Sequence, residues 1–203
     1  MALQQGRDAD PPAVRARLLL LSTLALCACA GSPTPPDWQL NAADSMEYFR
    51  QDYLVGDTAL AESDFADVKA NLKRTGRADL LARAELVRCA VRTASLEFDG
   101  CPAFEALRQD AGPEEIAYGD YLLGKGAGKA SDDPLSRLVA AGVALRKTAI
   151  TPAEIQAAVD LSSAQGWARP LLAWLGVQAK RAEDAGDRET AARLRRRMDL
   201  ISK

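Results

Sequence analysis

Apolar residues along most of the chain recur at spacings of three and four, which is the period of an amphipathic α-helix. The clearest run is Leu80, Ala84, Val87, Val91, Ala94 and Phe98. Two shorter runs precede it, one of Met46, Phe49 and Tyr53 and one of Ala61, Phe65, Val68 and Leu72. No stretch alternates convincingly with the period of two that a half-buried strand requires, so the pattern predicts helices and no sheet.

Helix start and stop signals divide this pattern into about eight helices. The expected starts are Asn41 and Asp133 as N-caps, Pro102 and Pro113 at first helical positions, and a capping box from Thr151 to Glu154. Glycines at 56, 76, 166 and 186 end helices. The sequence therefore predicts an all-α fold, an antiparallel array of helices with short connections and a possible joint at 125–130.

The first three helices and the last pair resemble the helical hairpins of tetratricopeptide repeats. The resemblance implies stacked antiparallel hairpins. The small and large consensus positions do not recur at a fixed period, so a regular repeat is not predicted.

The segment before the first helix has a different pattern. Arg15 and Arg17 precede an apolar run at 18–26, and small residues surround Cys27 and Cys29. The run is too short to span a bilayer, which needs roughly 20 apolar residues. A basic N-terminal part, a short apolar run and small residues at the C-terminal end are typical of a secretory signal peptide.

The C-terminal end of this segment, Leu26-Cys27-Ala28-Cys29, resembles the lipobox of bacterial lipoproteins. The resemblance implies that residues 1–28 are removed, that the thiol of Cys29 is diacylated and that the new amino terminus is acylated. Residue 30 is Ala and not Asp, which in enterobacterial lipoproteins implies transfer to the outer membrane, on its periplasmic face. Residues 29–40 would then be the lipid anchor with a proline-rich spacer, and 41–203 the helical domain.

Two alternatives to lipidation remain. Ala28-Cys29-Ala30 also fits an ordinary signal peptidase site, which predicts a periplasmic or secreted protein without lipid. In the other alternative, the apolar run is a buried helix of a cytosolic protein.

Cys89 and Cys101 are the cysteines that remain beyond this segment. In an oxidising compartment an isolated pair is typical of a disulfide. A helix from Cys89 to residue 96 rises about 10 Å, and the residues onward to Cys101 can return that distance if they are extended. The bond would hold the 96–102 turn against the helix. Two buried free thiols are one alternative, and a catalytic dithiol is another, although the spacing is not that of a C-x-x-C motif.

The composition narrows the possible chemistry. The chain contains no histidine, which removes histidine-based triads and the usual zinc sites. The formal net charge of −2 argues against a nucleic-acid module, which is normally basic. We therefore predict no catalytic set, no metal, no cofactor and no nucleic-acid partner.

One short motif points to an enzyme. Glu62-Ser63, with Phe65 close by, is similar to the Glu-Ser motif of lytic transglycosylases, which are all-helical murein enzymes. The resemblance implies that Glu62 is a general acid in an apolar cleft. The Gly-Leu-Met-Gln signature of that family is absent from this chain.

Taken together, these patterns predict a lipid-anchored periplasmic protein with a non-enzymatic interaction or assembly role, whose partner is another envelope protein. A murein-active enzyme that uses Glu62, and a helical domain that binds a small ligand or lipid, are the alternatives.

Overall fold

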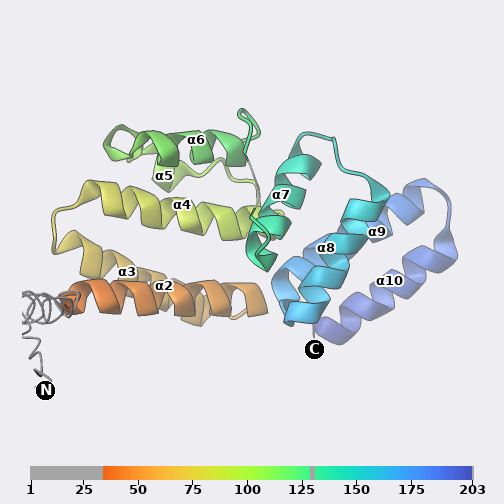
Figure 1. Ribbon diagram of the computed structural model, residues 1–203. Helices are drawn as coiled ribbons and strands as arrows, with labels where there is room; N and C mark the ends of the chain where they lie inside the picture. Colours follow the sequence, from red (N-terminus) through yellow and green to blue (C-terminus); the bar gives the residue numbers. More distant parts are fainter. Residues whose placement is uncertain (1–33, 129–130, 203) are drawn as a thin grey trace, which may run out of the picture. The chain divides into compact units, whose positions relative to one another are not determined.

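The computed structural model describes residues 34–128 and 131–202. These residues form nine α-helices and one short 3-10 helix, and no strand occurs in the described ranges (Figure 1). The predicted all-α fold is confirmed. The elements are α2 (Asp37–Val55), α3 (Thr58–Lys73), α4 (Ala78–Ala94), α5 (Pro102–Glu105), η2 (Arg108–Asp110), α6 (Pro113–Leu122), α7 (Pro134–Arg146), α8 (Pro152–Gln165), α9 (Ala168–Asp184) and α10 (Arg188–Ile201).

Helix α4 contributes to two hydrophobic cores on opposite faces. The first core joins α2 and α3 to Ala84 and Val91 of α4, and the rings of Phe49 and Phe65 lie 4.8 Å apart within it. The second core joins the other face of α4 to α5 through α9, with Trp174 fully buried. Figure 1 shows α2 and α3 on one side of α4, and α5 and α6 on the other.

Most of the predicted helix ends are found where local chemistry places them. Thr151 and Glu154 form the reciprocal capping box, since Thr151 N donates to Glu154 Oε2 at 2.7 Å and Glu154 N donates to Thr151 Oγ1 at 3.2 Å. Asp133 caps α7 by accepting from Ser136 N at 2.9 Å. Gly166 ends α8 in the left-handed region, with φ of 69°.

The first helix begins earlier than predicted. Helix α2 starts at Asp37, directly after Pro36, and is not capped at Asn41. Residues 37–40, which the sequence assigned to the spacer, are therefore helical. The physical reason is tertiary, because Trp38 packs against the first core and stabilises the additional turn.

The third predicted helix ends earlier than its apolar pattern indicates. Helix α4 stops at Ala94, and Phe98 lies outside it, 37% exposed. Leu96 adopts a left-handed conformation with φ of 62°, which ends the helix before Phe98 can join its face.

Helices α4 and α7 cross closely at Gly142. A Cβ atom at this position would collide with the carbonyl oxygen of Thr93. One residue further on, Trp174 Nε1 of α9 donates to the carbonyl oxygen of Ala94 at 3.2 Å. The end of α4 is thus fixed by both α7 and α9.

The remaining predicted segments lie partly outside the described residues. Residues 1–33, with Cys29 and the apolar run, are among them, as are residues 129 and 130 of the predicted joint. Before that gap, Gly126 accepts a hydrogen bond from Lys147 Nζ at 2.9 Å. Among the described helices, none combines the length and the apolar character needed to cross a bilayer.

Candidate functional site

The turn after α4, residues 95–101, lies between two candidate sites. One is a small pocket beside the disulfide, and the other is a larger, mainly apolar groove. Two backbone hydrogen bonds at the start of this turn close the end of α4. Leu96 N donates to Thr93 O at 3.0 Å, and Glu97 N donates to Arg92 O at 2.9 Å. Gly100 and Cys101 then take φ of 83° and 55°, which turns the chain back toward α4.

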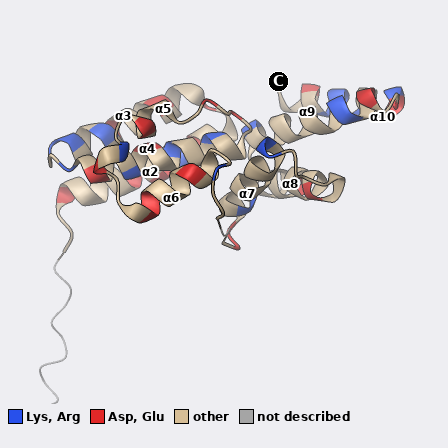
Figure 2. Cartoon of the chain, turned by 90° about the horizontal axis from the view of Figure 1, so that it is seen from above, with Lys and Arg blue, Asp and Glu red and all other residues tan. Residues whose placement is uncertain are grey.

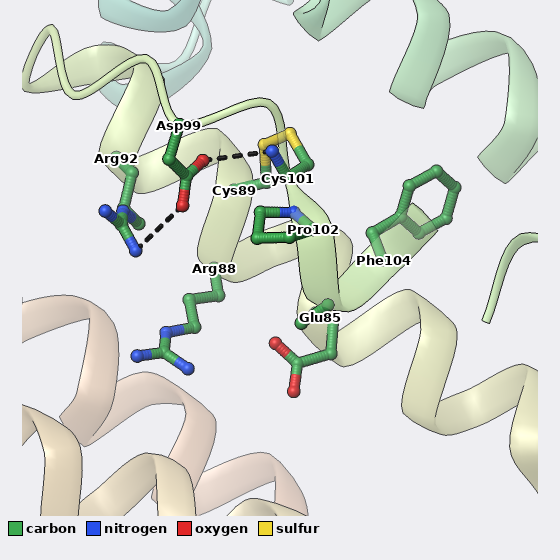
Figure 3. A pocket seen from close by; sticks show the side chains of 9 residues that line it. Glu85, Arg88, Cys89, Arg92, Asp99, Cys101, Pro102 and Phe104 are labelled. Carbon is green, nitrogen blue, oxygen red and sulfur yellow. Dashed lines mark hydrogen bonds and ion pairs between the residues drawn. A yellow bond between two sulfur atoms is a disulfide. The ribbon is translucent and has the colours of Figure 1, made fainter. Parts of the chain in front are cut away.

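Cys101 and Cys89 are joined by a disulfide that attaches this turn to α4 (Figure 3). Their Cα atoms are 5.4 Å apart, within the range that disulfides require. The arrangement agrees with the disulfide predicted from the sequence. Because the sulfur atoms are bonded to each other, the neighbouring group of Cys89, Asp99 and Cys101 does not offer thiolate ligands to a metal.

Ion pairs hold the same turn from two sides. Arg92 of α4 contacts Asp99 at 3.0 Å and Glu97 at 3.5 Å. Asp99 in turn accepts a hydrogen bond from Cys101 N at 3.0 Å. Arg169 of α9 lies 3.6 Å from Glu97. The turn is therefore fixed by a covalent bond and by charged side chains of two helices.

A small pocket of about 100 Å³ lies on the disulfide side of the turn. Figure 3 shows Glu85 and Arg88 below it, with Asp99 and the disulfide above. Glu85 is only 7% exposed, and burial raises the pKa of its carboxyl group, although the nearby Arg88 acts in the opposite direction. The pocket is too small for more than a few water molecules or a small ion.

A larger open groove of about 680 Å³ lies on the other side of the turn. This volume falls within the usual range of ligand-binding sites. We call it the turn groove. Its lining comes from the turn, from the segment after α7 and from α9, and consists of Ser95, Leu96, Phe98, Leu145, Thr148, Ile150, Ala173, Gly176, Val177, Lys180 and Arg181.

The backbone around the turn groove is strained. Leu96 and Thr148, which both line it, are two of the three residues other than glycine with positive φ in the described ranges, at 62° and 55°. A non-glycine residue in this region costs of order 1–3 kcal/mol and persists where surrounding structure imposes it. Such strain is concentrated at functional sites, which makes this groove the strongest candidate.

A buried hydroxyl group adds to this candidate. Ser95 is 4% exposed, and its Oγ has no hydrogen-bond partner among the described residues. An unsatisfied buried hydroxyl costs about 1–3 kcal/mol. Ser95 also contributes to the lining of the groove, so this cost falls at the groove.

The charge of the turn groove is of one sign. Lys180 and Arg181 line it, and no acidic side chain does so in the part of the chain that the structure describes. Lys180 pairs with Asp184, whereas Arg181 has no acidic partner among the described residues. Arg146 adds a third cation, since its guanidinium lies 5.1 Å from the ring centre of Phe98.

Glu62, the predicted general acid, lies elsewhere. Its side chain is 53% exposed and forms an ion pair with Arg88, whose Nη2 lies 2.7 Å from Glu62 Oε1. It is therefore placed in a surface ion pair and not in an apolar cleft. The murein-active alternative stays a prediction, as does lipidation of Cys29, which lies outside the described residues.

The sequence did not single out the turn groove. One signal was present in α9, because Ala173, Gly176, Val177, Lys180 and Arg181 recur at helical spacing on one face. The other walls come from segments far away in the chain, which no local pattern brings together.

No family model, no curated protein and no solved structure matches this chain in the comparisons made.

Proposed function

We propose that the chain is a lipoprotein of the bacterial envelope, anchored through Cys29, and that its helical domain binds another molecule without transforming it. The lipobox-like sequence supports the anchor, and Pro33, Pro35 and Pro36 before α2 support a semi-rigid spacer. Two or more acyl chains give stable membrane attachment, whereas one gives only marginal binding.

The observation that carries the binding role is the turn groove. It combines a ligand-sized volume, a mainly apolar lining and a few charged groups, which is the usual composition of a binding site. It also coincides with two strained residues and with a buried hydroxyl that has no hydrogen-bond partner within residues 34–128 and 131–202. This favours the ligand-binding alternative among the non-enzymatic roles.

The anchor is tested by intact-mass analysis of protein extracted from separated inner and outer membranes, beside a Cys29→Ala variant. We expect the outer-membrane fraction to contain a chain that starts at Cys29 and carries three acyl groups. A chain that retains Met1, or an unmodified one in the soluble fraction, would overturn the anchor.

The binding role is tested by photocrosslinking in living cells with a photoreactive amino acid at Phe98 in the groove. The matched control is Tyr48, an aromatic side chain of α2 that is 59% exposed and does not belong to the groove lining. A discrete adduct at position 98 and none at position 48 would support the proposal. Equal labelling at the two positions, or none at 98, would overturn a binding role for this groove.

A further inference from the structure

The wall of the turn groove that α9 provides changes character along the helix. Ala173 and Gly176 leave space because they carry little or no side chain, and Val177 adds an apolar surface. A Cβ atom on Gly176 would meet nothing closer than Met198 Cε at 3.9 Å. The next turn, at Lys180 and Arg181, is cationic. The groove is thus apolar along its length and positively charged at one end.

The opposite wall is apolar as well. Leu96, Leu145 and Ile150 are partly buried and pack against the second core, and Phe98 remains 37% exposed at the edge. Covering such apolar surface lowers the free energy in proportion to the area removed from water. An apolar chain laid along this wall would gain that energy, and a purely polar ligand would not.

The cationic end can attract an anion at modest cost. Arg181 lacks an acidic partner among the described residues, so an incoming anion does not have to displace one. Among the basic side chains of α10, Arg195 differs in this respect. Figure 2 shows acidic and basic residues mixed along that helix, and Arg195 pairs with Glu183 of α9.

From this arrangement we propose that the turn groove binds an acyl chain that is attached to an anionic head group. The chain lies against Leu96, Phe98 and Val177, and the head contacts Lys180 and Arg181. The inference rests on the proposed binding function, for which it names the ligand class. A free fatty acid and an acidic phospholipid share this chemistry, and the test separates them.

The experiment uses the full chain in nanodiscs of zwitterionic phosphatidylcholine. The probe is a sixteen-carbon fatty acid with a diazirine on the chain, and labelled residues are mapped by mass spectrometry of peptides. Its methyl ester has the same chain without the charge. We expect the acid to label residues of the groove about tenfold more than the ester, because two partly exposed charge pairs act on the acid alone.

Three variants make this test specific. Lys180→Glu/Arg181→Glu should lower labelling by the acid about tenfold and leave labelling by the ester unchanged. Arg193→Glu/Arg196→Glu makes the same change of charge on α10 and should have no effect. Gly176→Leu should block both probes, and its thermal midpoint shows whether the helix remains folded.

The outcomes separate this inference from the proposed function. Equal labelling by acid and ester would overturn recognition of the head group, while leaving a binding groove in place. Absence of labelling by both probes, together with an adduct to a protein at position 98 in cells, would overturn the acyl ligand and keep the binding role. With a diazirine-bearing phosphatidylglycerol, strong labelling identifies membrane lipid as the source, and labelling by the free acid alone identifies a fatty acid.

Discussion

The guanidinium group of Arg169 lies 4.3 Å from the ring centre of Tyr53, and its Nε donates to the carbonyl oxygen of Tyr53 at 2.7 Å. Its Nη2 donates to Thr58 Oγ1, also at 2.7 Å. A single side chain at the start of α9 thereby binds the end of α2 and the start of α3. The cation also complements the negative end of the α2 dipole.

Replacing Arg169 by Lys should therefore loosen the contact between α9 and the first helices. The planar guanidinium that both stacks and donates twice is lost, and we expect a decrease of about 2 kcal/mol in the free energy of unfolding. Urea denaturation measures this decrease in the free energy of unfolding. Arg196→Lys on the exposed face of α10 is the control and should remain within about 0.5 kcal/mol of the unsubstituted protein. An unchanged midpoint for Arg169→Lys would contradict the importance of this contact.

Gly142→Ala should destabilise the fold, although alanine is the better helix former. The added Cβ meets the backbone of Thr93, which cannot rotate away, so α4 and α7 must separate. We expect a loss of about 1–3 kcal/mol, typical of overpacking.

Gly176→Ala is the matched control for that substitution. It also lies inside a helix, but its Cβ would meet only Met198 Cε at 3.9 Å. It should be neutral or should stabilise the protein by up to about 1 kcal/mol through helix propensity. Thermal unfolding of the two variants side by side checks the pair, and the same sign for both would refute the close crossing.

Reduction of the Cys89–Cys101 disulfide should destabilise the second core. The bond closes a short loop, with a sequence separation of 12 residues, and a loop of this size contributes about 3 kcal/mol in the chain-entropy model. Denaturant titration with and without a thiol reductant measures the change. In the Cys89→Ala/Cys101→Ala variant the reductant should not change the stability. If it still does, the destabilisation arises from other cysteines and not from this disulfide.

Glu85→Gln should stabilise the protein at neutral pH. Burial raises the pKa of this carboxyl group above its unfolded value, so the folded state holds the proton more tightly. Stability is therefore lost as the pH rises through the folded pKa. The advantage of the Gln variant should be present at pH 7 and should shrink as the pH falls below about 4, near the unfolded pKa.

Unfolding measured at both pH values checks this sign. Asp199→Asn removes a carboxylate from the exposed end of α10 and serves as the control for the loss of one negative charge. A larger advantage for Glu85→Gln at low pH than at pH 7 would contradict the direction of the shift.

Much of the local structure follows from the sequence because its causes are local. The capping box at Thr151 and Glu154, the Asp133 cap and the glycine ends of helices depend on residues within a few positions of one another. The inward faces of α2 and α3 follow from apolar spacing, and Phe49, Phe65 and Val68 are buried as that spacing predicts. The pairing of Cys89 with Cys101 also depends on a short segment.

The central role of α4 could not be derived in the same way. Its pattern predicts one apolar face, whereas Ala82, Leu86 and Ala90 pack in one core while Ala84 and Val91 pack in the other. Alanine is compatible with both buried and exposed positions, so the sequence does not distinguish a helix covered on two sides from one covered on one side. Phe98 was assigned to the helix because it continues the apolar spacing, whereas the left-handed conformation of Leu96 ends α4 before it.

By itself, the sequence determined the all-helical class, most helix ends and the faces that α2 and α3 bury, since each depends on contacts within one or two turns. Only the tertiary structure decided that the 95–101 turn, the residues after α7 and the small-residue face of α9 meet in one groove. These three segments are distant in the chain, and the packing of α7 and α9 against α4 brings them together. The groove is therefore a property of long-range packing, which no local pattern encodes.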